Sequence, residues 1–301
     1  MFRTMLFVMG LAAALIGSAA FPQERTDPLL RPVAPDNAAR WLTPQAPIRV
    51  FRNAYLVGFA GLNVGLIRTE AGLVLIDGAL PQAVGAIEAN IRRLGFDPKQ
   101  IRYILSTEPH YDHASGIAAL ARDSGATVIA SVPAAKVLRQ GHSDADDPQA
   151  AWLVPFPAVA NVRGVRDGER LRLGSTVITA RATPGHTFGS MSWTWRSCEG
   201  RRCVTMVFAS SLNPLAADGY RFTDPAHAAI LTAFRRTLVV MRSMPCDVLL
   251  TSHPEPSGGD EKYARFQRQP VPNPYVDPAA CRSYADDSAQ LLTKRLADEA
   301  K

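Results

Sequence analysis

Four potential metal ligands lie within six residues of this chain: Glu108, His110, Asp112 and His113. They come directly after an apolar run at 101–107 that is typical of a β-strand. Imidazole and carboxylate are groups that a divalent ion such as zinc accepts. An extended backbone lets Glu108 and His110 face one way, and we expect the adjacent Asp112 and His113 to diverge toward two neighbouring metal ions. The spacing is not the helical i, i+4 pair of a zinc protease, so it predicts a different kind of metal site.

Two further histidines also follow strand-like runs. His186 comes after the alternating run at 176–182, and His253 comes after the apolar run at 247–251. Proteins that mix helices and strands build their sites just beyond the carboxyl ends of strands. Six ligands divided three and three would leave each of two tetrahedral zinc ions one open position, filled by a bridging water, which is typical of a catalytic site.

This ligand pattern resembles the metallo-β-lactamase superfamily, whose signature is His-x-His-x-Asp-His followed by two distant histidines. Within it, the chain resembles class B β-lactamases of the third subclass. The similar segments extend over most of the chain and lie at 74–78, 185–187, 208–213, 245–250 and 253–254. The resemblance implies an α/β fold, a four-layer αββα sandwich; the residues themselves indicate only two strand-rich halves.

Glu108 stands where the family has its first histidine. One interpretation is a decayed site in which Glu108 is a solvated carboxylate. The other is a variant site in which Glu108 is a ligand, and we favour it because glutamate binds zinc well and the rest of the motif is intact. The exchange changes the charge: two zinc ions, a hydroxide and two carboxylates sum to about one positive charge, against about two with histidine.

The resemblance implies zinc-dependent hydrolysis of the β-lactam ring of penicillins, cephalosporins and carbapenems, with two Zn²⁺ ions as cofactors. Asp112 is the expected catalytic residue, because it would bind one metal and orient the attacking water. Ser211, Asn213 and Tyr220 are the expected substrate contacts, although the family has a second serine at the position of Asn213. Ser211 lacks a Gly-x-Ser-x-Gly context, so it is not a nucleophile, and a simple turn role remains open for it.

Three alternatives remain. The chain could be another hydrolase of the same fold that acts on a lactone, thioester or phosphoester, because the metal motif does not separate these. It could be a di-iron redox enzyme, because added carboxylate ligation suits harder iron. It could also be a metal-binding relic without activity, if Glu108 had ruined the first site.

The elements that position these residues can be placed from periodicity and turn signals. Asp77, directly after one of the expected strands, is interpreted as orienting a metal-ligand loop. The polar segment 141–157 is expected to form a loop near the mouth of the site, and the Pro-rich segment 21–48 an arm around the body. Strands are expected at 49–58, 62–68, 72–76, 101–107, 127–130, 170–173, 176–182, 190–195, 204–209 and 247–251, and helices at 81–94, 117–124 and 226–243.

The first 20 residues predict a secretory signal peptide, with Arg3, an apolar core at 6–16 and small residues at 18–20. We therefore expect a single domain at 21–301 that is a monomer in the periplasm, without a membrane attachment. With 47% hydrophobic and 20% charged residues the composition is that of a globular protein. The net charge of +6 comes from scattered arginines rather than a Lys/Arg run, which argues against nucleic acid as a partner and is compatible with a small anionic substrate.

The four cysteines suit an exported protein. Cys198 and Cys203 flank a turn and could join a hairpin, and Cys246 and Cys281 could tie the last strand to the C-terminal segment. Four cysteines permit three pairings; proximity and the family resemblance favour 198 with 203 and 246 with 281.

Overall fold

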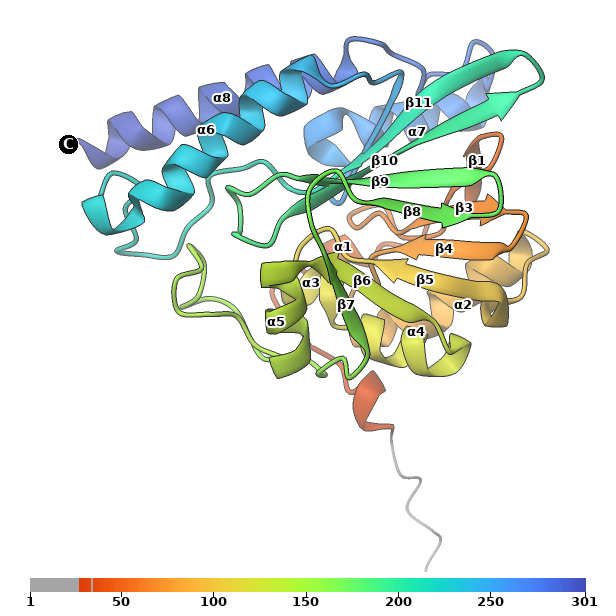
Figure 1. Ribbon diagram of the computed structural model, residues 1–301, viewed down its shortest axis with the longest axis horizontal. Coiled ribbons are helices and arrows are strands. Elements are labelled where there is room, and N and C mark those ends of the chain that lie inside the picture. Colours follow the sequence, from red (N-terminus) through yellow and green to blue (C-terminus); the bar gives the residue numbers. More distant parts are fainter. Residues whose placement is uncertain (1–26, 34) are drawn as a thin grey trace, which may run out of the picture.

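Two β-sheets lie face to face in the computed structural model, which describes residues 27–33 and 35–301 (Figure 1). Helices cover the outer face of each sheet, so the molecule has four layers in the order α, β, β, α, as expected. The expected signal peptide lies outside the described residues. Among the helices that the structure describes, none combines the length and the apolar character that a membrane span requires.

The first sheet has the strand order β1-β2-β3-β4-β5-β6-β7 and the second β12-β11-β10-β9-β8. In the first sheet β1 to β4 are antiparallel neighbours and β4 to β7 are parallel; in the second, only β11 and β12 are parallel. The strands are β1 (Ile48–Phe51), β2 (Ala54–Leu56), β3 (Gly65–Thr69), β4 (Gly72–Ile76), β5 (Ile101–Leu105), β6 (Thr127–Ser131), β7 (Val162–Val165), β8 (Arg170–Leu173), β9 (Thr176–Ala182), β10 (Met191–Glu199), β11 (Arg202–Ala209) and β12 (Val248–Thr251). The helices are α1 (Ala38–Trp41), α2 (Val84–Arg93), α3 (Tyr111–Ala114), α4 (Ile117–Ser124), α5 (Val132–Gln140), α6 (Ala228–Ser243), α7 (Gly259–Arg268) and α8 (Ala280–Glu299). Short 3₁₀ helices span Pro28–Leu30, Pro81–Ala83, Pro98–Gln100, Pro225–His227 and Glu255–Ser257.

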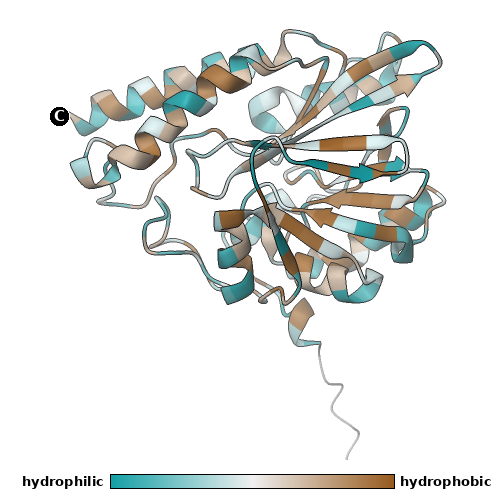
Figure 2. Ribbon diagram, viewed as in Figure 1, coloured by the Kyte–Doolittle hydropathy of each residue, from teal (hydrophilic) through white to brown (hydrophobic). Residues whose placement is uncertain are grey.

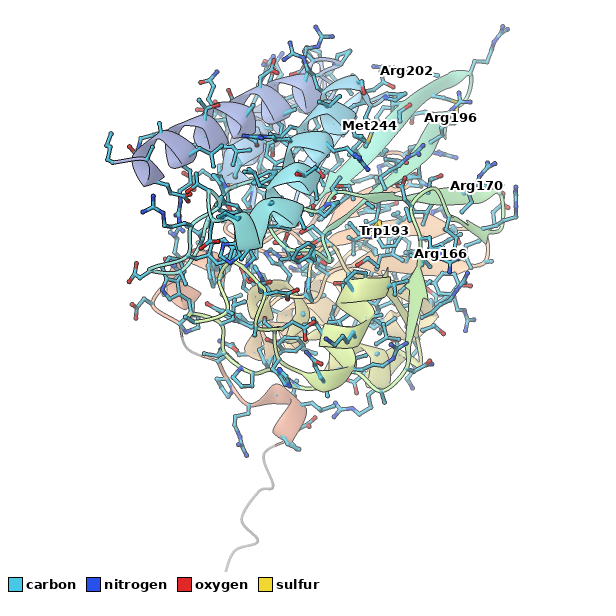
Figure 3. The ribbon with its side chains drawn as sticks, turned by 60° about the vertical axis from the view of Figure 1, so that its left-hand side comes forward. Arg166, Arg170, Trp193, Arg196, Arg202 and Met244 are labelled. Atoms are coloured by element: carbon cyan, nitrogen blue, oxygen red, sulfur yellow. A yellow bond between two sulfur atoms is a disulfide. The ribbon has the colours of Figure 1, made fainter. Side chains whose placement is uncertain are left out.

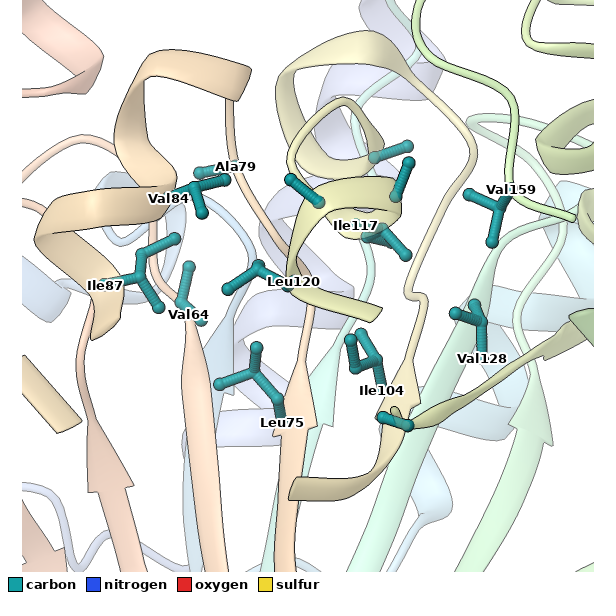
Figure 4. Close-up of a cluster of buried hydrophobic side chains, with 14 of the residues drawn as sticks. Val64, Leu75, Ala79, Val84, Ile87, Ile104, Ile117, Leu120, Val128 and Val159 are labelled. Atoms are coloured by element: carbon teal, nitrogen blue, oxygen red, sulfur yellow. The ribbon is translucent and has the colours of Figure 1, made fainter. Parts of the chain in front are cut away.

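Alternation along the strands creates separate apolar layers. In β4, Leu73 and Leu75 face the helices α2 and α4, whereas Val74 and Ile76 face the second sheet. Figure 4 shows Leu75 from β4 against side chains of α2 and α4. A third apolar layer lies between the second sheet and helices α6 and α8. Figure 2 shows the corresponding concentration of hydrophobic residues on the central strands.

The structure differs from the expected elements in several places. The run 49–58 is divided by a turn at Arg52–Asn53, and the third strand begins only at Gly65. Helices α1, α3, α5, α7 and α8 and strand β7 were not expected. The segment 141–157 has no helix or strand, as predicted. Disulfide bonds join Cys198 to Cys203 across the β10–β11 hairpin and Cys246 to Cys281 between the start of β12 and α8.

Candidate metal centre

The six predicted ligands meet at one end of the two sheets. Glu108 and His110 lie in the loop after β5, and Asp112 and His113 lie in the short helix α3 that this loop enters. From the second sheet, His186 follows β9 and His253 follows β12. All except His253 are buried. The parallel run of β4 and β5, and of β11 and β12, brings these strand ends together.

The ligands form two groups of three. Within each group the donor atoms lie within 4.8 Å of one another. The first group is Glu108, His110 and His186; the second is Asp112, His113 and His253. The expectation that Asp112 and His113 diverge was wrong, because the chain turns into α3 at Tyr111, and a helical turn lets both side chains reach the second group.

Glu108 is held firmly in the first group. Ser211 donates two hydrogen bonds to its carboxylate: the backbone N–H donates to Oε2 at 3.0 Å, and the hydroxyl donates to Oε1 at 2.8 Å. His113 Nε2 lies 2.9 Å from the same Oε1, and His186 Nε2 lies 4.0 Å from it. Glu108 is 0% exposed, so it is not the solvated carboxylate of the alternative interpretation.

Asp112 is the centre of the second group. Its Oδ2 lies 3.3 Å from His113 Nε2 and 3.2 Å from His253 Nε2. Asp77 supports the loop from behind, accepting hydrogen bonds from the Thr107 N–H at 2.7 Å and the Thr107 hydroxyl at 2.6 Å. Asp77 belongs to neither group, so it orients the ligand loop as predicted.

Backbone carbonyls fix the orientation of two of the histidine rings. His186 Nδ1 lies 3.1 Å from the Asn213 carbonyl oxygen, and His253 Nδ1 lies 3.0 Å from that of Gly61. A carbonyl only accepts, so Nδ1 carries the proton in both rings, which leaves Nε2 as the nitrogen that can bind a metal. The Nε2 atoms are therefore the donors of both rings toward a metal.

The close packing of imidazoles and carboxylates shifts the pKa values of these groups. Burial alone would raise the pKa of Glu108, but His113 and His186 outweigh it, and the pKa is lowered. Asp112 behaves in the same way, and His113 holds its pKa well below its usual value. Burial raises the pKa of Asp77 to about 7, against the opposing effects of His113 and Thr107. Both ligand carboxylates are therefore anionic at neutral pH, as metal binding requires.

A cavity of about 470 Å³ opens beside the two groups. Ser211 and Asn213, both predicted substrate contacts, line it, and Asn213 Oδ1 is buried without a hydrogen-bond partner among the described residues. Tyr220 is not in its wall, because its ring stacks on His227 at 3.8 Å between centroids. The cavity is also lined by the bulky side chains of Trp41, Tyr111, Trp152, Leu153 and Leu215.

Sequence reasoning missed two residues of the loop 141–157. Asp147 Oδ2 lies 3.0 Å from His110 Nε2, and Gln149 Nε2 lies 3.1 Å from His186 Nε2. Both residues are less than 9% exposed. They stand 37 residues from the histidines that they touch, so no local spacing could have identified them. The position of the loop at the site was predicted, but not these contacts.

The donor chemistry fits zinc in both groups. Each group combines one carboxylate with two imidazoles, which is the ligand set of a catalytic zinc ion that keeps an open position. With histidine in place of Glu108 the first group would carry no anion, so the glutamate makes the two groups alike in composition.

Comparisons with known proteins agree with this geometry. The family model of the metallo-β-lactamase superfamily matches residues 57–253. A similar solved structure, described as the first B3 metallo-β-lactamase with an active-site glutamic acid, is 54% identical, with a TM-score of 0.85 over 92% of this chain and 99% of that one. The Rm3 metallo-β-lactamase is 40% identical, with a TM-score of 0.86 over 89% and 100% of the two chains. MEM-A1, a subclass B3 enzyme from a soil metagenome library, is 42% identical, with a TM-score of 0.83 over 86% and 98%.

Proposed function

Because the chain belongs to the metallo-β-lactamase superfamily and, within it, to the B3 metallo-β-lactamases, we propose that it hydrolyses β-lactam antibiotics with two zinc ions. The first zinc is held by Glu108, His110 and His186, and the second by Asp112, His113 and His253. The observation that carries this assignment is the pair of three-residue groups, each with one carboxylate and two imidazoles. When bound, zinc lowers the pKa of water and polarises the carbonyl under attack.

The protein residues bind the metals, orient the attacking water and shield the site from solvent. Asp112 is the catalytic residue: Oδ2 faces His113 and His253, which leaves Oδ1 to orient the attacking water by accepting its hydrogen bond. Burial of Glu108 and Asp112 keeps bulk water away from both groups. Asp77 and Ser211 fix the ligand loop and the Glu108 carboxylate, so the donors are in position before substrate arrives.

Substrate enters the cavity beside the groups. None of its described lining residues is lysine or arginine, so neutral donors must meet the carboxylate of the antibiotic. The Asn213 side-chain amide is one such donor. The Ser211 hydroxyl is a second, which would exchange its bond to Glu108 for one to the substrate, and Tyr220 would contact substrate only after leaving His227. Penicillins, cephalosporins and carbapenems are the proposed substrate classes.

The cellular location is part of the same proposal. Residues 1–20 are removed as a signal peptide, and a single domain at 21–301 acts as a monomer in the periplasm, where both disulfide bonds can form. The alternatives of another hydrolase or a di-iron enzyme are not favoured, because the similar solved structures are β-lactamases.

The test is hydrolysis of nitrocefin, a penicillin and a carbapenem by the purified mature protein. Chelation should abolish turnover, and added zinc should restore it as the metal content rises to two equivalents. Full turnover in protein shown by elemental analysis to be metal-free would refute the metal-dependent mechanism. Zinc binding without β-lactam turnover would instead favour another substrate.

A further inference from the structure

A second cavity, of about 750 Å³, lies at the end of the sandwich away from the metal ligands. Its wall includes the β1–β2 turn, the β3–β4 turn, the β8–β9 turn and the adjoining parts of β10 and β11. His186 follows the last residue of β9, whereas Thr176, the first residue of β9, lines this cavity. The length of that strand separates the cavity from the metal centre by roughly 20 Å.

Four arginines line this cavity: Arg52, Arg68, Arg170 and Arg196. Within the described part of the chain, none of the four forms an ion pair, unlike Arg163, which pairs with Glu169 nearby in the chain. The single acidic residue in the wall, Glu70, already accepts a hydrogen bond from the Ser175 N–H at 3.1 Å. Four guanidinium groups and one carboxylate leave the cavity with about three uncompensated positive charges.

Strand register fixes the positions from which these cationic side chains project. Arg170 pairs with Thr179, and Thr179 with Thr194, so the three residues form one row across β8, β9 and β10. Arg196 is two residues beyond Thr194 on the same face and pairs with Thr205. Figure 3 shows Arg170 and Arg196 on the same side of the molecule. The row therefore places two guanidinium groups and several hydroxyl groups on one pleated surface.

We propose that this cavity is a second binding site, which takes a compact, soluble anion that carries two or more phosphate groups. Guanidinium groups bind phosphate oxygens with paired, charge-assisted hydrogen bonds, and threonine hydroxyls supply further donors. An anion with several charges matches about three uncompensated cations better than a β-lactam with a single carboxylate. The cavity, bounded by three turns, has room for a small molecule, and its four arginines are exposed to solvent.

The experiment uses tripolyphosphate as the probe and the zinc-loaded mature enzyme, with calorimetric titration at low ionic strength. The test variant is Arg170→Ala/Arg196→Ala. The matched control is Arg235→Ala/Arg236→Ala, which removes the same charge from exposed positions on α6. Nitrocefin turnover and zinc content are measured before and after each titration, because they report any binding of the probe at the metal centre.

The expected result is one bound equivalent in the wild type and in the control, with affinity at least about tenfold weaker in the test variant. Turnover before titration should be the same in all three proteins, and binding should weaken as salt is added. Equal weakening in both variants would show a general charge effect and overturn the proposal, as would full binding in the test variant. Binding to vesicles of anionic phospholipid through these arginines, without binding of tripolyphosphate, would also overturn it in favour of a membrane surface.

Discussion

The carboxylate of Glu108 makes three close contacts with two neighbouring residues. Ser211 donates two hydrogen bonds to it, and His113 of the other ligand group lies 2.9 Å away. A histidine at this position would present one donor nitrogen and no charge. Glu108 instead presents an anion that also interacts with the second group, so we expect the two metal sites to be more tightly coupled than with a histidine.

Substitution of Glu108 tests its role as a ligand. Glu108→Ala should lose or weaken the first zinc and lower kcat by at least about a hundredfold, whereas Glu108→His keeps a ligand and should retain substantial turnover. Glu108→His also removes a negative charge beside the metals, which favours hydroxide over water, so the acidic limb of its pH–rate profile should move to lower pH. Zinc stoichiometry and pH–rate profiles of the three proteins measure this. If Glu108→Ala bound two zinc ions as tightly as the wild type and kept its turnover, Glu108 would not be a ligand.

Ser211 offers a separate test, because it could act on the metal site or on the substrate. Ser211→Ala removes the hydroxyl that holds Glu108 Oε1, so the affinity of the first zinc should fall by about tenfold. The control is Ser283→Ala at an exposed position of α8. Zinc titration against a competing chelator separates the roles: a raised KM with unchanged zinc affinity would mean that Ser211 serves the substrate alone.

At the scale of elements, the end of α8 is anchored by one buried carboxylate. Glu299 accepts from the Phe222 N–H at 3.0 Å and the Thr223 N–H at 2.8 Å, and Arg295 donates to it at 2.6 Å. Burial alone would raise the pKa of Glu299, but these hydrogen bonds outweigh it and lower the pKa. A lowered pKa in the folded state means that the anion stabilises the fold above the pKa of the unfolded chain, and that this stability is lost as the pH falls through the folded value.

Glu299→Gln should therefore lower the free energy of unfolding at pH 7 by about 1–3 kcal/mol. The difference from the wild type should shrink as the pH falls below about 4.5, the ordinary glutamate value, because the unfolded chain takes up a proton there, and it should vanish only below the lowered pKa of the folded protein. Denaturant melts of both proteins from pH 7 to pH 3 measure the difference. A difference that stays constant over this range would mean that the charge of Glu299 has no part in the anchoring.

The two disulfide bonds should differ in their effect on stability. They close loops with sequence separations of 5 and 35 residues. A longer closed loop restricts the unfolded chain more, so Cys246→Ser should destabilise the protein more than Cys198→Ser, by roughly 1–2 kcal/mol. Each variant is best combined with Ser at the partner cysteine, to avoid a free thiol. Equal melting curves for the two double variants would contradict the loop-entropy reasoning.

How far the sequence predicts these elements depends on how clear their periodicity is. The strands with strong apolar runs, such as β4, β5 and β12, lie where they were expected, because a buried strand needs such a run. Helix α5 has its own signals, a cap at Ser131 and an αL glycine at Gly141, and reading them together would have found it. Helix α8 was harder, because its exposed face is strongly polar and only a narrow stripe meets α6. The contacts of Asp147 and Gln149 arise only from tertiary structure.

At the scale of the whole molecule, the metal centre belongs to both sheets. Each group takes two ligands from the loop of the first sheet and its third from the second, His186 in one case and His253 in the other. Metal held by both groups would therefore connect the two halves of the sandwich, and its binding free energy would add to the stability of the fold. A free zinc concentration of 1,000 times the Kd contributes about 4 kcal/mol per site.

Removal of metal should consequently lower the melting temperature as well as the activity. For a chain of this size we expect a fall of roughly 10 °C in excess chelator. Differential scanning calorimetry of the zinc-loaded and stripped enzyme measures it, and Glu108→Ala, with a weakened first site, should show a smaller shift. An unchanged melting temperature in metal-free protein would mean that the two sheets do not depend on the metals for their association.

Because each ligand group is divided between the two sheets, the stage of folding at which a metal ion binds selectively is also determined. Glu108, His110, Asp112 and His113 are synthesised together, but neither group is complete until the chain has reached His186 or His253 and the second sheet has packed on the first. A partly folded chain can hold a metal only loosely and with little discrimination. If the chain is exported before it folds, the ion that fills the centre is set by the metals available where folding finishes, and not by those in the compartment where the protein was made.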